Sequence, residues 1–253
     1  MAVGGDVDYE RGGAGYAAQR RADPRIAAHI HAALGDARTV LNVGAGAGSY
    51  EPRDRYVLAV EPSAVMRAQR PPGLGLAIEA FAEALPLDDR SVDAVMAVAT
   101  VHQWPDMAKG LAELRRVSRG PVIIVAFDGP TLERFWANDY APELTVAELA
   151  RYPGLDAVAA GVGRDVEIRT VPIPFDCTDG FTEAFYGRPE RLLDPAVRRA
   201  QSSWGFVGVA VESRFVETLS ADLASGAWDA RYGALRTQPT QDGALRIIIG
   251  HRG

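Results

Sequence analysis

The chain has 253 residues, 47% of them hydrophobic, with a formal net charge of −6 and a single cysteine, Cys177. The length fits one α/β domain with an accessory part, and the negative charge offers no basic field for nucleic acid. No run of 18 apolar residues predicts a membrane span, and one cysteine cannot form an internal disulfide, so we expect a cytoplasmic protein.

From residue 23 onward, helical and extended patterns alternate along the chain. Residues 1–22, which are rich in glycine and acidic residues near the start, are predicted to be a flexible arm. Asp23-Pro24 is typical of a helix start, and Gly35 of its end. Another helix is expected over 107–117, and strands over 39–43, 56–60, 74–79, 91–99 and 121–127. This order favours a doubly wound, Rossmann-like sheet of about seven mainly parallel strands, with the ligand at their carboxyl ends.

The second half of the chain is less regular. Residues 131–151 are predicted to be helical, residues 166–171 to form a half-exposed strand, and residues 245–249 to form a final strand. Between these strands, 181–228 reads as mostly helical, which is too long for a plain connection. We therefore expect a core over 23–177, a helical lid or acceptor-binding insert over 178–235, and a final core strand within 236–253.

A glycine-rich turn follows the first predicted strand. Gly44, Gly46 and Gly48 alternate there, and glycine lets a backbone approach a ligand closely. The dinucleotide fingerprint requires a third glycine at position 49, which is Ser49, and this counts against a nicotinamide or flavin enzyme. Glu61, at the end of the second predicted strand, is placed to accept hydrogen bonds from ribose hydroxyls. Together these features indicate a nucleoside site.

Several motifs carry a resemblance to a known family. They are VLNVGAGAGSYE at 40–51, AEALPLDD at 82–89, SVDAV at 91–95 and VHQWPD at 101–106. This combination resembles class I S-adenosylmethionine (SAM)-dependent methyltransferases, specifically the small-molecule branch with a type 11 domain that includes ubiquinone and menaquinone biosynthesis enzymes. The resemblance covers roughly residues 16–127 and implies SAM as cofactor and S-adenosylhomocysteine as product.

The resemblance also implies roles for individual residues. The glycine turn would face the methionine part and the ribose of SAM through Gly44, Ala45, Gly46 and Gly48, and Glu61 would bind the ribose hydroxyls. The adenine would lie against Pro62 and Met66, with its edge flanked by Ala82 and Glu83. The last residue of the predicted cofactor site is Ala99. Tyr16 and Arg20 match a Y-x-x-x-R pattern whose arginine meets the cofactor carboxylate. Two departures are Asn42, where an acidic residue is usual, and Phe81, where relatives often have aspartate.

Few residues are candidates for chemistry on an acceptor. His102 follows the fourth predicted strand and is interpreted either as a general base or as a structural hydrogen-bonding group. Asp128 follows the fifth strand and would either meet the acceptor or cap a helix. Six aromatic residues would line an acceptor pocket or belong to the core: Trp136, Tyr140, Phe181, Phe185, Tyr186 and Trp204. No spacing predicts a metal site.

The sequence thus predicts a SAM-dependent methyltransferase acting on a small molecule, with oxygen acceptors preferred over nitrogen and nitrogen over carbon. A SAM-binding protein of the same fold without methyl transfer, either a cyclase or a regulator, is the alternative. We expect a monomer or homodimer with no nucleic-acid or membrane partner.

Overall fold

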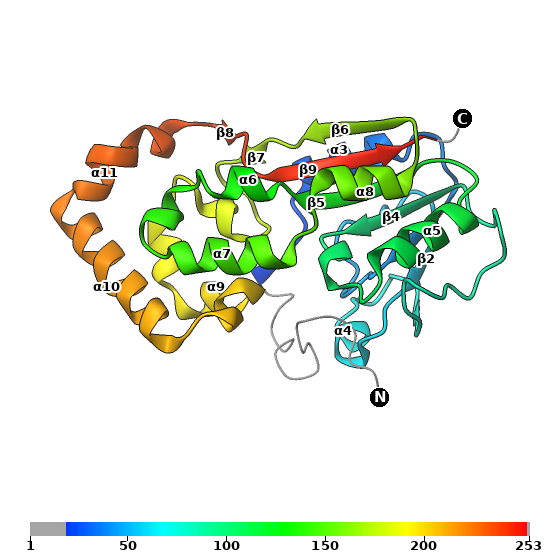
Figure 1. The fold of residues 1–253 in the computed structure, drawn as a ribbon, viewed down its shortest axis with the longest axis horizontal. Helices are drawn as coiled ribbons and strands as arrows, with labels where there is room; N and C mark the ends of the chain where they lie inside the picture. Colours follow the sequence, from blue (N-terminus) through cyan, green and yellow to red (C-terminus); the bar gives the residue numbers. More distant parts are fainter. Residues whose placement is uncertain (1–18, 252–253) are drawn as a thin grey trace.

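The computed structural model describes residues 19–251 and contains a seven-stranded sheet (Figure 1). The strand order is β3-β2-β1-β4-β5-β9-β6, and β9 runs antiparallel to both of its neighbours. The strands are β1 (Thr39–Val43), β2 (Tyr56–Val60), β3 (Ala77–Ile78), β4 (Ala94–Val98), β5 (Val122–Phe127), β6 (Val166–Thr170) and β9 (Leu245–Gly250). The predicted Rossmann-like fold class is confirmed.

The order of the strands places a crevice at the carboxyl ends of β1 and β4. From β1 the chain proceeds to β2 and β3 on one side, and then returns to β4 and β5 on the other. Leu41 of β1 pairs with Leu58 of β2 and with Val95 of β4, all three in parallel register. In open α/β sheets such a reversal of strand order is where ligands bind.

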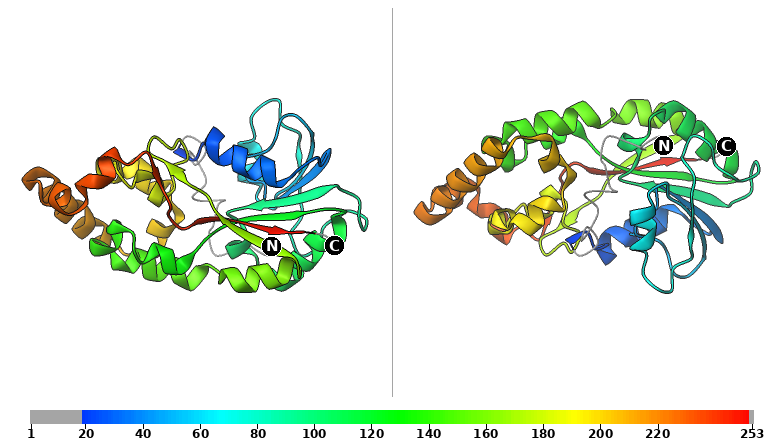
Figure 2. Two further views of the ribbon diagram at one scale, coloured as in Figure 1. Left: turned by 90° about the horizontal axis from the view of Figure 1, so that it is seen from above. Right: turned by 90° about the horizontal axis from the view of Figure 1, so that it is seen from below.

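Helices cover both faces of the sheet (Figure 2). On one face, α3 (Pro24–Ala33) buries Ile26 and Ile30, and Asp23 caps it by accepting the N–H of Arg25 at 2.9 Å. On the other face lie α5 (Met107–Val117) and α8 (Leu155–Val162), whose apolar side chains join a second hydrophobic cluster. The short α4 (Ala64–Ala68) follows β2.

Three local predictions were wrong. The third strand spans two residues instead of 74–79, because it is an edge strand preceded by Pro72 and Gly73, and Leu76 is 96% exposed. The helix expected over 131–151 is divided into α6 (Gly129–Leu132), the 3-10 helix η2 (Trp136–Asp139) and α7 (Pro142–Arg151). Pro142 lacks the N–H that a continuous helix would need. Helix α8 was not predicted.

The helical block after β6 begins and ends at a two-stranded ribbon of β7 (Ile173–Pro174) and β8 (Thr240–Gln241). Its elements are η3 (Thr182–Phe185), η4 (Pro189–Leu193), α9 (Pro195–Arg199), η5 (Ser202–Phe206), α10 (Val209–Ser225), α11 (Ala227–Tyr232) and η6 (Gly233–Thr237). Phe215 and Leu219 of α10 are fully buried, in a cluster that also contains Trp136 and Leu144 from the segment after β5. The accessory part is therefore built from two separate stretches of chain.

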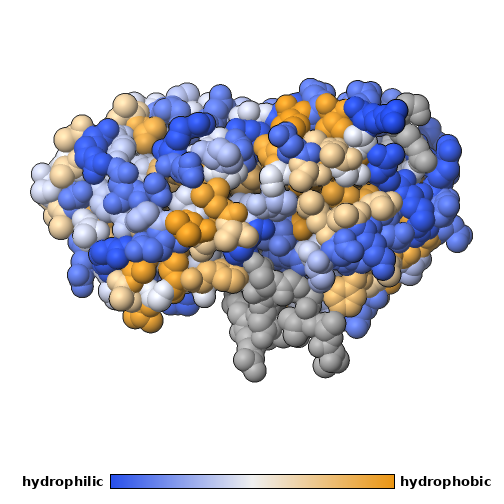
Figure 3. All heavy atoms as spheres, viewed as in Figure 1, coloured by the Kyte–Doolittle hydropathy of each residue, from blue (hydrophilic) through white to orange (hydrophobic). Residues whose placement is uncertain are grey.

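Hydrophobic residues on the face shown in Figure 3 occur in separate groups among hydrophilic ones, over both the sheet and the helical part. Within residues 19–251, no helix combines the length and the apolar character that crossing a membrane requires.

Candidate functional site

The glycine turn after β1 adopts a backbone that glycine favours. Gly44, Gly46 and Gly48 have φ angles of 67°, 52° and 90°, in the left-handed region. A Cβ on Gly44 would lie 2.2 Å from Oγ1 of Thr100, a residue that follows β4. The turn can therefore approach the end of β4 only because position 44 has no side chain.

Glu61 at the end of β2 meets this turn. Its carboxylate accepts the backbone N–H of Gly46 at 2.8 Å and that of Ser63 at 2.8 Å. The side chain is buried, and burial raises the pKa of its carboxyl group above the usual value despite these two hydrogen bonds. A carboxylate oxygen has more than one acceptor direction, so Glu61 retains capacity for ligand hydroxyls. The structure thus brings the two parts of the predicted nucleoside site together.

A first pocket lies at this meeting point. It holds about 860 Å³ of space including its open mouth. Seven of the predicted cofactor residues line it: Arg20, Gly44, Ala45, Gly46, Glu61, Met66 and Ala99. Ala99 has a φ of 50°, which is strained for a residue other than glycine and is typical of a functional position.

Asn42 presents an unpaired oxygen to this pocket. Its Nδ2 donates to Oε1 of Glu51 at 3.0 Å, and Glu51 also forms a buried, bidentate ion pair with Arg70. Because a carboxylate only accepts, the amide must turn its nitrogen toward Glu51. The buried Oδ1 has no hydrogen-bond partner among the described residues. It can therefore accept a hydrogen bond from a ligand in this pocket.

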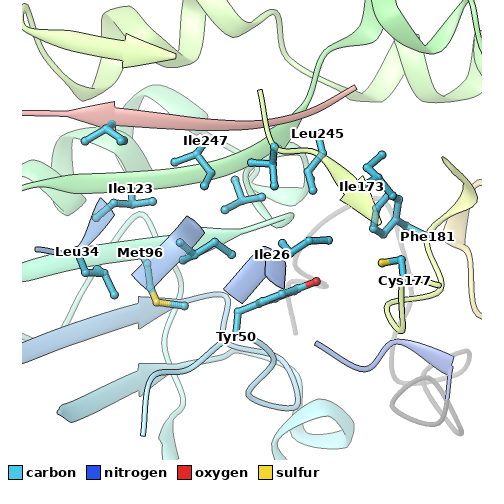
Figure 4. Close-up of a cluster of buried hydrophobic side chains, with 14 of the residues drawn as sticks. Ile26, Leu34, Tyr50, Met96, Ile123, Ile173, Cys177, Phe181, Leu245 and Ile247 are labelled. Atoms are coloured by element: carbon cyan, nitrogen blue, oxygen red, sulfur yellow. The ribbon is translucent and has the colours of Figure 1, made fainter. Parts of the chain in front are cut away.

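One wall of the first pocket comes from distant parts of the chain. Asp179 pairs with Nε of Arg20 at 2.6 Å and accepts the hydroxyl of Tyr50 at 2.8 Å. In Figure 4 the Tyr50 ring lies beneath Ile26, with its hydroxyl directed toward the segment of Cys177. Residues 19–22, expected to belong to a flexible arm, therefore pack here, since Gln19 also accepts the N–H of Gly180.

The remaining predicted cofactor residues do not line the first pocket. A Cβ on Gly48 would lie 2.3 Å from Cδ1 of Leu74, so that glycine is needed for packing. Ala82 lies in a hydrophobic cluster, the carbonyl of Pro62 accepts from Arg67, and Glu83 accepts the N–H of Asp106. Tyr16 lies outside the described residues.

A second pocket adjoins the first. It holds about 550 Å³ including its mouth and shares five lining residues with the first pocket, namely Arg20, Ala99, Gln103, Phe127 and Phe181. His102, in the 3-10 helix η1 (Val101–Gln103), lines this second pocket. Its ring packs edge-on against Tyr152 with centroids 4.9 Å apart, and its Nε2 is 3.3 Å from Nε2 of Gln103.

Other sequence candidates lie elsewhere. Asp128 accepts the Thr131 hydroxyl at 2.5 Å and pairs with Arg246 at 3.2 Å, and it is not among the described residues lining either pocket. Cys177 is buried, which raises the pKa of its thiol to about 12 and removes it as a nucleophile at neutral pH. Of the six aromatic candidates, Phe181 lines both pockets; the others, Trp136, Tyr140, Phe185, Tyr186 and Trp204, are buried in hydrophobic clusters.

Sequence reasoning missed two carboxyl groups in the second pocket. Glu148 comes from α7 and Glu183 from η3, and burial raises the pKa of each to about 7. Both lie in stretches without a recognisable motif, so no sequence signal marked them.

Comparison with known proteins places this geometry in a family. A model described as a methyltransferase domain matches residues 41–125, which contain the glycine turn and Glu61. An uncharacterized methyltransferase of Mycobacterium tuberculosis is 42% identical over 175 residues, covering 65% of this chain and 65% of that protein. A crystal structure from Anabaena variabilis, of a candidate methyltransferase from an antibiotic biosynthesis pathway, is 31% identical, covers 92% of this chain and 99% of its own, and has a TM-score of 0.85.

This chain belongs to the class I SAM-dependent methyltransferases. A SAM-dependent methyltransferase of Thermotoga maritima superposes with a TM-score of 0.55 over 97% of this chain and 95% of its own, at 17% identity, which shows the shared fold alone. The residues of the first pocket fit the family's cofactor. Asn42 Oδ1 is an unsatisfied acceptor suited to an ammonium group, and Glu61 is a carboxylate suited to ribose hydroxyls. Residues 19–251 contain no group of three or more His, Cys, Asp or Glu side chains arranged to hold a metal ion.

Proposed function

We propose that this chain transfers a methyl group from SAM to a small molecule bound in the second pocket. The main support for this proposal is that the two pockets share three lining residues that lie at or just after the carboxyl ends of β4 and β5, namely Ala99, Gln103 and Phe127. An acceptor in the second pocket would lie beside a cofactor in the first, and methyl transfer requires that the reacting atoms be held close and aligned.

The chain's own residues then have separate tasks. Glu61 would bind the ribose hydroxyls, Asn42 Oδ1 the amino group, and Arg20 the carboxylate of the bound cofactor. SAM supplies a methyl group bonded to a positively charged sulfur, so the protein does not have to form a covalent intermediate. Phe127 and Phe181 line both pockets and would exclude water from the reacting atoms.

His102 is the group that we propose to assist the acceptor. It lines the second pocket, and a hydroxyl or ammonium acceptor must lose a proton during methylation. Its imidazole packs edge-on against the Tyr152 ring. The acceptor order expected from the sequence was oxygen, nitrogen, carbon; the carboxyl groups in the second pocket favour nitrogen instead.

Calorimetric titration with S-adenosylhomocysteine and with NAD tests the cofactor. We expect binding of S-adenosylhomocysteine and none of NAD. Incubation with methyl-labelled SAM and a panel of amines, phenols and carboxylic acids then tests transfer, with protein lacking added acceptor as the control. Tight cofactor binding without label transfer to any compound would favour the cyclase or regulator alternative.

A further inference from the structure

The second pocket is lined by charged and polar side chains as well as by apolar ones. Among the described residues that line it, the charged side chains are Arg20, Glu148 and Glu183. Arg20 already forms an ion pair with Asp179, at 2.6 Å and with both side chains largely buried. The charge that remains for an occupant of this pocket is therefore negative.

The Glu183 carboxylate already has a structural hydrogen-bond partner. Its two carboxylate oxygens lie 3.1 and 2.9 Å from the backbone nitrogen of Ala244, whose N–H they accept, and the residue is 3% exposed. A Cβ on Gly243 would lie 2.7 Å from Oε1 of Glu183, so the chain before β9 is closely packed against this carboxylate. Glu183 thus links η3 to the start of β9 through this hydrogen bond.

Glu148 has no such backbone partner in the described structure. It is a partly buried residue on α7 whose carboxyl is desolvated by burial, hydrogen-bonded to Ser203 and attracted by the positive charge of Arg151. Arg151, one turn further along α7, faces away in part, since its guanidinium stacks on the Phe206 ring at 4.1 Å and reaches Ser202 at 3.5 Å. Glu148 is therefore the acidic group that can turn to an occupant.

We propose that the methyl acceptor is an amine, bound with its protonated nitrogen on the Glu148 carboxylate and its carbon skeleton against Leu132, Phe127 and Phe181. This inference rests on the proposed methyl transfer. A desolvated carboxylate is costly unless it is paired, and an ammonium group supplies both charge and hydrogen bonds. Acceptors carrying a carboxylate or phosphate near the same end would be repelled.

Amine methylation also requires a group that takes a proton from the bound nitrogen. An ammonium nitrogen has no lone pair, so one proton must leave it first, and His102, which lines the same pocket, is the base proposed for this transfer while the Glu148 carboxylate holds the ammonium group. The neutral nitrogen then forms a bond to the methyl carbon as the carbon–sulfur bond breaks, and that bond's electron pair stays on sulfur. The product is a methylated ammonium, and His102 returns its proton to water when the product leaves.

A matched pair of probes tests the proposal without requiring turnover. Protein saturated with S-adenosylhomocysteine is titrated calorimetrically with 2-phenylethylamine and 2-phenylethanol, and with hexylamine and hexanol, which differ only in the polar group. At pH 8 we expect at least one amine to bind ten times more tightly than its alcohol. At pH 6 the amine affinity should fall about tenfold, because a carboxyl with a pKa near 7 is then mostly protonated.

Two variants assign the effect to one carboxylate. Glu148→Gln keeps the shape but removes the charge, and should abolish both the preference for the amine and most of its pH dependence. Glu143→Gln on the same helix, where Glu143 pairs with Arg214, is the control and should leave both unchanged. The difference between the parent and Glu148→Gln isolates Glu148 from the other ionisable groups that the described residues place around the pocket, which include Arg20, His102, Arg151, Tyr152, Glu183, Asp128 and Arg246.

The outcomes separate the two proposals. If S-adenosylhomocysteine does not bind, the proposed function and the amine acceptor fail together. If it binds but each alcohol binds as tightly as its amine in the parent protein, or no amine binds, only the amine acceptor is overturned. Unchanged amine affinity in a folded Glu148→Gln protein would also overturn the amine acceptor alone. Should that variant fail to fold, the amine–alcohol comparison in the parent protein decides.

Discussion

The carboxylate of Glu61 accepts the backbone N–H of Gly46 at 2.8 Å, across fifteen positions of sequence. This bond joins the end of β2 to the turn that follows β1. Since the carboxylate is buried and held by Ser63 as well, its position is fixed before any ligand arrives. Such preorganisation reduces the ordering cost of binding.

Replacing Glu61 by alanine should weaken S-adenosylhomocysteine binding at least tenfold, about 1.4 kcal/mol, because the ribose hydroxyls lose their acceptor. Calorimetry measures the effect. Glu79→Ala is a matched control, since Glu79 follows β3 nearby and its exposed carboxylate pairs with Arg67. Equal affinities of the Glu61 and Glu79 variants would contradict the ribose assignment.

Gly44→Ala should destabilise the protein by roughly 2–5 kcal/mol, because it combines a left-handed backbone with a collision against Thr100. Gly35→Ala is the comparison, since Gly35 has a φ of 55° but open space where a Cβ would lie. That variant should cost about 1–2 kcal/mol. Urea denaturation measures both, and equal losses would show that the contact with Thr100 is unimportant.

His102→Ala should retain cofactor affinity while turnover falls by about 100-fold or more, as is typical when a proton-transfer group is removed. Gln103→Ala removes the neighbouring contact at 3.3 Å and should have a smaller effect on turnover. Binding is followed by calorimetry and turnover by label transfer. Full activity of the His102 variant would exclude it as a base.

Asp23 should make stability depend on pH in the acid range. Burial opposes ionisation, but hydrogen bonds from Arg25 and from the N–H of Thr178 outweigh it and lower the pKa to about 2 from 3.8. The folded pKa is depressed, so its stabilisation is present above about pH 4 and lost as the pH falls toward 2. We expect Asp23→Asn to cost about 2 kcal/mol at pH 7, and less at pH 3. Asp176→Asn, at the exposed partner of Arg25, should change stability little.

The helical residues 178–235, predicted from the sequence as a lid, should gain hydrogen-exchange protection when cofactor product and acceptor are both bound. Phe181, Thr182 and Gln201 line the second pocket, so an occupant would contact this stretch directly. Helix α5, none of whose residues lines either pocket, provides the reference segment. No added protection in 178–235 would contradict closure.

The sheet and the meeting of the glycine turn with Glu61 were predictable because their signals are local. Each central strand is a short apolar run, and the glycine turn and Glu61 each sit directly after one. The wrong predictions have local causes too: Pro142 interrupts a helical pattern whose apolar spacing continues past it. An edge strand with one neighbour is likewise shortened by the turn before it.

The acceptor side could not be predicted, because its residues meet only in three dimensions. Glu148 comes from α7 and Glu183 from η3, two different segments of the helical part, and both line the second pocket. A glutamate in a helical stretch usually faces water, and nothing in its neighbours along the chain reveals burial. Family motifs end before these segments begin.

The hydrophobic cluster that contains Trp136, Leu144, Phe215 and Trp228 limits how this protein can be re-engineered. If residues 178–235 alone were exchanged for the equivalent stretch of a relative, η2 and α7 would lose the side chains against which Trp136 and Leu144 pack. New acceptor specificity is therefore expected to require paired changes in both stretches of the gene, and chimaeras that transplant only one should express as unstable protein.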